Sequence, residues 1–303
     1  MENLWKGVSH HAGLRVVKTR LLNKDADAAL LRGMSSHGMQ WYPKFARRGS
    51  IEATKKAGAN VFRIAMYTDE GGYLSDPSVK QDVIRAVDDT LSLGMYAIID
   101  WHILFDNDPM ANADKAEEFF RDMSKRYKNE PGVIYEICNE PNGADVTWSG
   151  SVKPFAERII PVIRENAPES VILVGSPTWS QDVDIAAADP LKYDNIMYTL
   201  HFYAGTHGEE LRSKCRRALE MGAPVFASEW GVSRADGSGG VFTEQSDVWL
   251  DFLEGLGISW CNWSLGDRDE TSAALLPGAP ENWSEEHLSE SGRYVMDRLK
   301  RPY

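Results

Sequence analysis

The sequence predicts that the whole chain, residues 1–303, forms one (β/α)₈ TIM barrel of the α/β class, and three observations support this. A length of 303 residues suits a single barrel of this kind. Short apolar runs alternate with longer stretches of helical period, and eight such runs occur along the chain. No GxGxxG segment follows the first run, as an open sheet that binds a dinucleotide would require.

The expected strands are the apolar runs, which are rich in Val, Ile, Phe and Ala. They are Ala29 to Met34, Asn60 to Met66, Met95 to Trp101, Val133 to Asn139, Val171 to Gly175, Asn195 to His201, Pro224 to Glu229 and Ile258 to Ser264. Near-continuous apolar strands separated by helices are typical of a parallel sheet covered on its outer face.

The expected helices lie between these runs, and several have a breaking residue where the helix should end. They are Ser50 to Ala57, Val79 to Leu93, Ala113 to Tyr127, Lys153 to Asn166, Asp182 to Ala187, Gly208 to Met221, Glu244 to Gly255 and Ser291 to Lys300. Asp76-Pro77 is expected to open the second helix, and Gly58, Gly94 and Gly222 are expected to end the first, second and sixth.

The composition limits the classes of partner. The chain is 43% hydrophobic and 26% charged, with a mean hydropathy of −0.39 and a net charge of −12. A run of about 18 apolar residues, as a membrane span requires, does not occur in the sequence. The acidic balance disfavours nucleic acid and anionic membranes as partners, whereas a neutral polymer remains compatible with it.

The three cysteines, Cys138, Cys215 and Cys261, form no CxxC pair, so neither a disulfide framework nor a zinc site is predicted. Cys138 and Cys261 lie in apolar runs and are expected in the core. The first residues, MENLWKGVSHHAGL, contain no apolar stretch of signal-peptide type. Both a cytoplasmic location and a removed leader are compatible with that start.

Polar and aromatic residues recur where the predicted strands end. They include His37 after the first run, Arg63 within the second, His102 after the third, Asn139 and Glu140 at the fourth, His201 and Tyr203 at the sixth, Glu229 at the seventh and Trp263 in the eighth. Functional residues of α/β barrels cluster at the carboxyl ends of the strands. Because an unpaired charge at the end of a buried strand is costly, this recurrence indicates a site.

Two of these residues are glutamates on the fourth and seventh strands, Glu140 and Glu229, which should face one another across the barrel mouth. Two carboxylates that face one cavity can hydrolyse a glycosidic bond: one protonates the leaving oxygen and the other attacks the anomeric carbon. We expect Arg63 and Tyr203 to favour the charged form of one carboxylate, and like-charge repulsion to keep the other protonated.

The same segments resemble those of family-5 glycoside hydrolases, particularly the bacterial endo-β-1,4-glucanases. The resemblance covers residues from about 20 to about 300 and rests on RGMSSHGMQWY (32–42), NVFRIAMY (60–67), IIDWH (98–102), VIYEICNEPNG (133–143), TLHFYAGTHG (199–208), VFASEWG (225–231) and CNWSLGDRDETSAAL (261–275). It implies a retaining double displacement on a β-1,4-glucan such as cellulose, with no metal or other cofactor.

By this resemblance, Glu140 is the acid/base and Glu229 is the nucleophile. Further substrate-binding positions are implied around the cleavage point (Arg63, His102, Asn139, His201, Tyr203 and Trp263), on the non-reducing side (His37 and Trp41) and on the leaving-group side (Trp179). Such enzymes are secreted, so an extracellular location is implied. We expect a monomer, with polysaccharide as its partner.

One loop departs from the family pattern. Where relatives often carry a Lys after the eighth strand, this chain has Arg268, followed by Glu270. Arg is planar and does not replace Lys in bonding to sugar hydroxyls, so we expect Arg268 and Glu270 to contact the sugar with a geometry that differs from that of the family's Lys.

Other interpretations remain open at this point. The same mechanism could act on mannan, xylan, xyloglucan or mixed-linkage glucan, and a catalytically silent sugar-binding barrel is a third candidate. Arg63 could be a structural ion-pair partner, His102 and His201 could be core histidines, and the three tryptophans could be packing residues. A metal-dependent amidohydrolase would need an HxH pair at a strand end, but the only close histidine pair is His10-His11 in the N-terminal tail.

Overall fold

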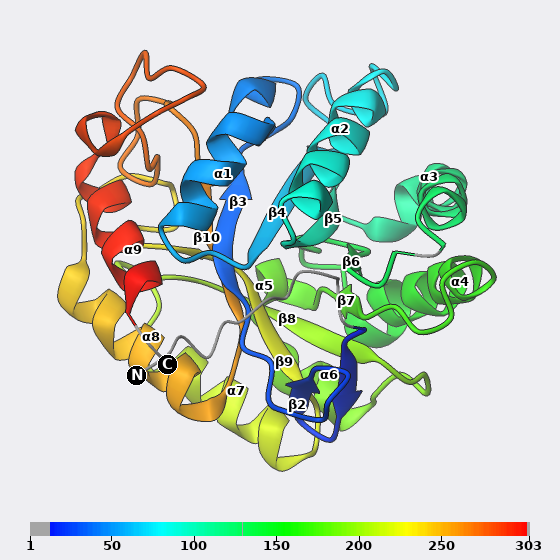
Figure 1. Ribbon diagram of the computed structural model, residues 1–303. Coiled ribbons are helices and arrows are strands. Elements are labelled where there is room, and N and C mark those ends of the chain that lie inside the picture. Colours follow the sequence, from blue (N-terminus) through cyan, green and yellow to red (C-terminus); the bar gives the residue numbers. More distant parts are fainter. Residues whose placement is uncertain (1–12, 129, 302–303) are drawn as a thin grey trace.

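The computed structural model describes residues 13–128 and 130–301 and contains a closed barrel of eight parallel strands (Figure 1). Around the barrel, the order is β10-β3-β4-β5-β6-β7-β8-β9. The strands are β3 (Arg32–Ser36), β4 (Val61–Tyr67), β5 (Tyr96–His102), β6 (Val133–Glu136), β7 (Ile172–Val174), β8 (Ile196–Tyr203), β9 (Val225–Gly231) and β10 (Trp260–Leu265). All eight predicted strands are therefore confirmed, with ends that shift by a few residues.

Helices surround the strands on the outside of the barrel (Figure 1). They are α1 (Arg48–Lys56), α2 (Val79–Ser92), α3 (Ala113–Arg126), α4 (Lys153–Arg164), α5 (Pro177–Ser180), α6 (Val183–Ala188), α7 (Glu209–Glu220), α8 (Thr243–Leu256) and α9 (Glu290–Lys300). Short turns precede or follow some of them: η1 (Pro43–Ala46), η2 (Pro109–Asn112), η3 (Trp148–Val152) and η4 (Glu285–His287). The eight predicted helices correspond to all of these α-helices except α5.

The glycines predicted to end helices are confirmed, and the second helix begins at the predicted residue. Gly58, Gly94 and Gly222 have φ angles of 113°, 72° and 89°, the left-handed backbone in which a glycine ends a helix without strain. Helix α2 begins at Val79, the predicted first residue, with Ser78 rather than the Asp-Pro pair at its N-cap. Asp76 instead accepts a hydrogen bond from the backbone N–H of Ser78 at 3.0 Å, so the Asp-Pro pair forms the turn that leads into the helix.

A short hairpin that the sequence did not predict precedes the barrel. Strands β1 (Arg15–Val17) and β2 (Arg20–Leu22) pair antiparallel. The N–H of Val16 donates to Oδ1 of Asn195 at the start of β8, which places the hairpin at the amino ends of the strands. Leu14, Leu21 and Leu31 pack there against inward-facing residues of the barrel, so this segment closes its floor and leaves the carboxyl ends open.

The core occupies two layers, as expected for this fold. The larger layer lies between the sheet and the helices, and the smaller one fills the barrel interior. Cys138, Cys215 and Cys261 are buried and free, which confirms the prediction for Cys138 and Cys261. None of the helices in the described part of the chain is long and apolar enough to cross a membrane.

Candidate active site

A cleft lies at the carboxyl ends of the strands. Its volume is about 2160 Å³, which includes the part that is open to solvent. Every site residue expected from the sequence lines it except Arg63 and Asn139, which are buried. The lining residues are His37, Gln40, Trp41, Tyr42, Tyr67, Glu70, His102, Leu104, Phe105, Glu140, Trp179, Gln181, His201, Tyr203, His207, Glu229, Ala235, Asp236, Gly237, Trp263, Arg268 and Glu270. The closed parallel barrel thus gathers residues from distant parts of the sequence around one opening.

Glu229, on β9, is held by a donor at each of its carboxylate oxygens. Arg63 donates from Nη1 to Oε2 at 2.9 Å, and the Tyr203 hydroxyl donates to Oε1 at 2.8 Å. Burial alone would raise the pKa of Glu229, but the positive charges of His201 and Arg63 and the bond from Tyr203 outweigh burial and lower it. Glu229 is therefore set up to be ionised.

Glu140 follows β6, and its pKa is shifted in the opposite direction. Its Oε1 lies 3.0 Å from Nδ1 of His201. Burial, together with the negative charge of Glu229, raises the pKa of Glu140 to about 7, although His201 and Arg63 oppose the shift. A carboxylate oxygen of Glu140 and one of Glu229 lie within 4.8 Å of each other. Two neighbouring carboxyl groups with proton affinities pushed apart in this way can serve as an acid and a nucleophile.

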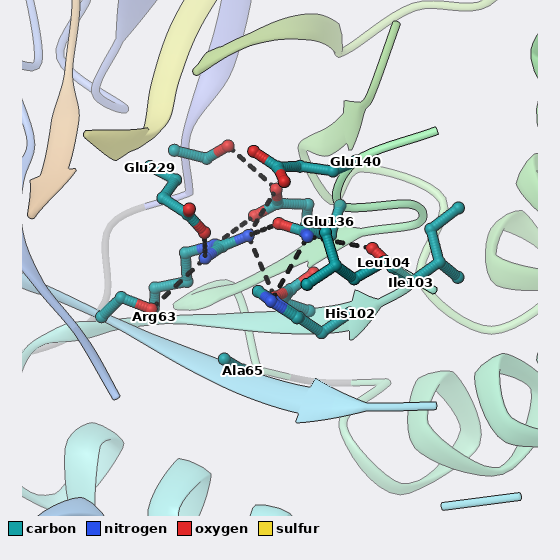
Figure 2. Close-up of polar contacts among 12 residues, drawn as sticks. Arg63, Ala65, His102, Ile103, Leu104, Glu136, Glu140 and Glu229 are labelled. Carbon is teal, nitrogen blue, oxygen red and sulfur yellow. Dashed lines mark hydrogen bonds and ion pairs between the residues drawn. The ribbon is translucent and has the colours of Figure 1, made fainter. Parts of the chain in front are cut away.

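Arg63, on β4, is the cation around which the buried part of the site is built (Figure 2). Besides Glu229 it contacts two further carboxylates: Nε lies 2.8 Å from Oε2 of Glu136, and Nη2 lies 3.0 Å from Oδ2 of Asp100. Arg63, Asp100 and Glu136 have no exposed surface. Arg63 is thus both a structural ion-pair partner in the core and a hydrogen-bond donor to Glu229, so the two interpretations of this residue do not exclude each other.

Asn139 and His102 form the wall between β5 and β6. Asn139 accepts a hydrogen bond from Nη2 of Arg63 at 2.6 Å and donates one to the carbonyl of Ile103 at 3.0 Å. His102 has its Nδ1 2.6 Å from Oδ2 of Asp100. Burial, helped by the charge of Arg63, lowers the pKa of His102 to about 3, so its ring is neutral in the working range of most enzymes.

The three predicted tryptophan platforms differ in exposure. Trp41 is 43% exposed and Trp179 is 45% exposed, so both present ring surface to the cleft. Trp263 lines the cleft but is only 6% exposed. Its ring stacks on His102 at 5.2 Å between centroids and lies 5.0 Å from His37. Trp263 therefore both packs the wall of the site and offers it a narrow surface.

Arg268 and Glu270 are brought together in the loop after β10. Arg268 Nε lies 3.1 Å from Oε2 of Glu270, whose Oε1 accepts a bond from the Ser272 hydroxyl at 2.6 Å. Arg268 also lies 3.4 Å from Nε2 of His37. Burial and the charge of Arg268 lower the pKa of His37 to about 3. Both loop residues line the cleft, so the Arg found in place of Lys stands at the predicted position.

Several residues of the site were not singled out from the sequence. Tyr67, at the end of β4, packs against His102 with ring centroids 4.2 Å apart and planes tilted by 33°, and Phe105 is 61% exposed at the rim. Ser228 and Glu136 lie beneath the cleft and bond to each other. A signal existed for Glu136, since it interrupts the apolar run VIYEIC, where a lone charge must be paired if it faces inward.

Among the described residues, Glu140, His201 and Glu229 place one potential ligand atom each close enough to surround a metal ion. Arg63 already places a positive charge beside Glu229, and that charge would repel a metal cation bound at the same position. The His10-His11 pair considered for metal binding lies outside the described residues.

Comparisons with known proteins agree on the family. Residues 22–269 match the family model described as Cellulase (glycosyl hydrolase family 5). The chain is 52% identical to Endoglucanase A of Evansella cellulosilytica over 277 residues, covering 90% of this chain and 57% of the relative. It is 48% identical to an endoglucanase of Clostridium saccharobutylicum, covering 94% and 64%. The chain therefore spans less than two thirds of the length of these two relatives.

A solved structure gives the same result. The catalytic domain of the Thermobifida fusca endoglucanase Cel5A, in complex with cellotetraose, superposes with a TM-score of 0.92 at 34% identity, covering 97% of this chain and 99% of that one. The barrel, the cleft and these matches lead to one conclusion: the chain belongs to the cellulase family, glycosyl hydrolase family 5.

Proposed function

We propose that this chain is the catalytic domain of a retaining endo-β-1,4-glucanase, with Glu140 as acid/base and Glu229 as nucleophile. The observation that supports it best is the contrast between these neighbouring carboxyl groups: the pKa of Glu140 is raised to about 7 and that of Glu229 is lowered. The names of the relatives and the cellotetraose bound by the Thermobifida fusca domain support a β-1,4-glucan as substrate.

In the first step, an oxygen of ionised Glu229 attacks the anomeric carbon while the bond from that carbon to the leaving oxygen breaks. The proton of Glu140 passes to the leaving oxygen, which departs as the hydroxyl of the released sugar. Arg63 and Tyr203 keep Glu229 ionised and fix its carboxylate beforehand. The product of this step is a glycosyl-enzyme on Glu229, with Glu140 left as a carboxylate.

In the second step, Glu140 takes a proton from a water molecule, whose oxygen attacks the anomeric carbon and releases Glu229 as a carboxylate. The separation of the carboxylates, within 4.8 Å, favours this course. Retaining enzymes hold the two groups about 5–5.5 Å apart, whereas inverting enzymes leave about 6.5–9.5 Å for a water molecule. No metal is required, and the Arg63 charge at Glu229 supports acid–base chemistry over metal binding.

The open cleft supports internal cleavage of a long chain. Trp41 is exposed in it on the loop after β3, Trp179 is exposed in it on α5, which follows β7, and Trp263 lies in β10. Sugar rings present C–H faces that pack on such indoles. We further propose that His37, Trp41, Arg268 and Glu270 contact the non-reducing side of the substrate and Trp179 the leaving-group side. A monomeric, secreted enzyme acting on extracellular polysaccharide is part of the same proposal.

The test is release of reducing ends from carboxymethylcellulose, with glucomannan and xylan in parallel, by the wild-type protein and Glu229→Gln. We expect release from the cellulose derivative that the variant loses, because a neutral amide cannot form the glycosyl-enzyme. Faster release from mannan or xylan would change the substrate but keep the mechanism. Binding of all polymers without any product would instead support a silent sugar-binding barrel, and unchanged release by Glu229→Gln would remove the nucleophile assignment.

A further inference from the structure

A third glutamate, Glu136, lies in the interior of the barrel beneath the two proposed catalytic carboxylates. It is fully buried on β6 and does not line the cleft. Arg63 donates to both of its oxygens, at 2.8 and 3.0 Å, and the Ser228 hydroxyl donates to Oε1 at 2.9 Å. A buried charge costs several kcal/mol unless it is paired, so Glu136 is held as an anion by a dedicated set of donors.

A chain of hydrogen bonds connects this buried anion to Glu140. Nε2 of His201 lies 2.9 Å from the Ser228 oxygen, and Nδ1 of the same ring lies 3.0 Å from Oε1 of Glu140. The order is therefore Glu136, Ser228, His201, Glu140, and it passes from β6 through β9 and β8 to the loop after β6. Glu140, the proposed acid/base, is thus linked to Glu136, a carboxylate that does not line the cleft.

The direction of these bonds follows from the chemistry of the groups. An ionised carboxylate only accepts hydrogen bonds, so the single hydroxyl proton of Ser228 points at Glu136. The Ser228 oxygen can then only accept from the imidazole, which requires a proton on Nε2 of His201. Burial would raise the pKa of Glu136, but the charge of Arg63, the nearby ring of His201, whose Nε2 lies 3.6 Å from Oε1, and the bonds from Arg63 lower it to about 2, so the carboxylate stays ionised.

Resting on the proposed function, we propose that Ser228 and Glu136 are positioning residues for acid catalysis: the Ser228 hydroxyl, held by Glu136, accepts Nε2–H of a cationic His201 and orients the ring so that its Nδ1–H donates to Oε1 of Glu140. The other oxygen of Glu140, Oε2, is then the one that carries the acidic proton. When that O–H bond breaks and the proton passes to the leaving oxygen, Glu140 becomes a carboxylate that already accepts a bond from the cationic ring.

The charges around His201 agree with this arrangement. Burial would lower its pKa, but Glu136, whose Oε1 lies 3.6 Å from Nε2, the bond to Glu140 and the charge of Glu229 raise it to about 9. The titratable and charged groups that surround the ring come from four strands and the loop after one of them: Glu136 and Glu140 from β6 and its following loop, Glu229 from β9, Arg63 from β4, and Asp100 and His102 from β5. Glu136 and Glu140, the carboxyl groups at the two ends of the hydrogen-bond chain, favour the cationic form of the His201 ring.

A competing explanation is that Glu136 acts only on the nucleophile, by holding Arg63 against Glu229. Substituting Glu136 would disturb both routes at once, whereas Ser228 bonds to Glu136 and His201 and not to Arg63. Ser228→Ala therefore isolates the route to Glu140. Ser246→Ala is a matched control, because Ser246 is also fully buried, lies on α8 and has no hydrogen-bond partner at its hydroxyl among the residues that the structure describes.

The experiment compares Ser228→Ala, Ser246→Ala and wild type on two substrates, cellotetraose and dinitrophenyl β-cellobioside, whose leaving group needs no protonation. We expect kcat of Ser228→Ala on cellotetraose to fall roughly 10-fold, the effect of one lost bond in a charged chain. The rate of the dinitrophenolate burst on the aryl glycoside, which reports formation of the glycosyl-enzyme alone, should stay near wild type, as should the KM for cellotetraose. The alkaline limb of the pH profile should move to higher pH, because Glu140 loses stabilisation of its charged form.

Equal loss on both substrates with an unmoved alkaline limb would overturn the proposal in favour of the Arg63 route, and no loss on either would remove Ser228 from catalysis. Nitrogen NMR of the wild-type imidazoles, with His201 assigned by its absence in His201→Gln, tests the proton directly without a Ser228 variant. Protons on both Nε2 and Nδ1 of His201 are expected, and a ring that lacks either proton would refute the arrangement. Because this readout needs no turnover, failure of the proposed function is distinguishable from failure of the inference.

Discussion

A carboxylate oxygen of Glu140 lies within 4.8 Å of one from Glu229, although 88 positions separate the two residues in the sequence. Parallel pairing of β8 with β9, in register at His201 and Glu229, brings Glu229 to the cleft beside His201, and His201 in turn bonds to Glu140. The proximity raises the pKa of one carboxyl group through the charge of the other, and the different donors around each decide which of them stays ionised.

Substituting Glu140 by Gln should slow substrates according to their leaving group. General acid catalysis contributes about 10²–10⁴-fold, so cleavage of cellotetraose should fall by roughly that factor, because the sugar leaving group needs a proton. Formation of the glycosyl-enzyme from dinitrophenyl β-cellobioside, followed as the burst of released phenolate, should be affected least. An equal loss on both substrates would remove Glu140 from the acid role.

The pH dependence of kcat/KM should be bell-shaped, with limbs set by these two groups. Glu140 must carry its proton, so activity should fall as the pH rises through about 7, the value to which its pKa is raised. Glu229 must be ionised, so activity should fall on the acid side only below the usual range of a carboxyl group, because its pKa is lowered. Initial rates on cellotetraose across the pH range check this. An alkaline limb at the ordinary pKa of a glutamate would contradict it.

The exposed tryptophans should govern binding more than turnover. Trp41→Ala and Trp179→Ala each remove one aromatic surface from the cleft, a contact of about 0.5–1.5 kcal/mol, so KM for carboxymethylcellulose should rise roughly 2- to 10-fold with kcat changed less. Tyr193→Ala is the matched control, since Tyr193 is 37% exposed but does not line the cleft. If neither tryptophan variant raises KM above that of the control, the platform assignment is wrong.

Closure of the barrel depends on a small residue in β3. A Cβ on Gly33 would lie 1.8 Å from the carbonyl oxygen of Val61 in β4, where the two strands pair. Gly33→Ala should therefore lower the free energy of unfolding by about 2 kcal/mol or more, because backbone must move. Gly255→Ala, in α8 with open space around it, should raise it by up to about 1 kcal/mol. Denaturant unfolding measures both, and equal stabilities would contradict the packing described.

The sequence was sufficient to predict the barrel and half of the residues that line the cleft, because eight apolar runs place the polar residues that follow them at one end and the family resemblance adds residues of the loops. Its limits have physical causes. The hairpin β1–β2 has strands of three residues each, too short for a periodic pattern. Glu136 lies within an apolar run, and the sequence does not show whether such a residue faces the barrel interior or the helices. Trp263 ends a strand like other cleft residues, but its low exposure depends on rings from β3 and β5.

The stereochemistry of hydrolysis tests the central claim most directly. Proton NMR recorded in the first minutes of cellotetraose cleavage distinguishes the anomer formed by the enzyme from the one that mutarotation produces later. A double displacement through Glu229 predicts that the β-anomer appears first, and the approach of the two carboxylates to within 4.8 Å favours this course. Initial appearance of the α-anomer would mean single displacement by water and would contradict the roles assigned to Glu140 and Glu229.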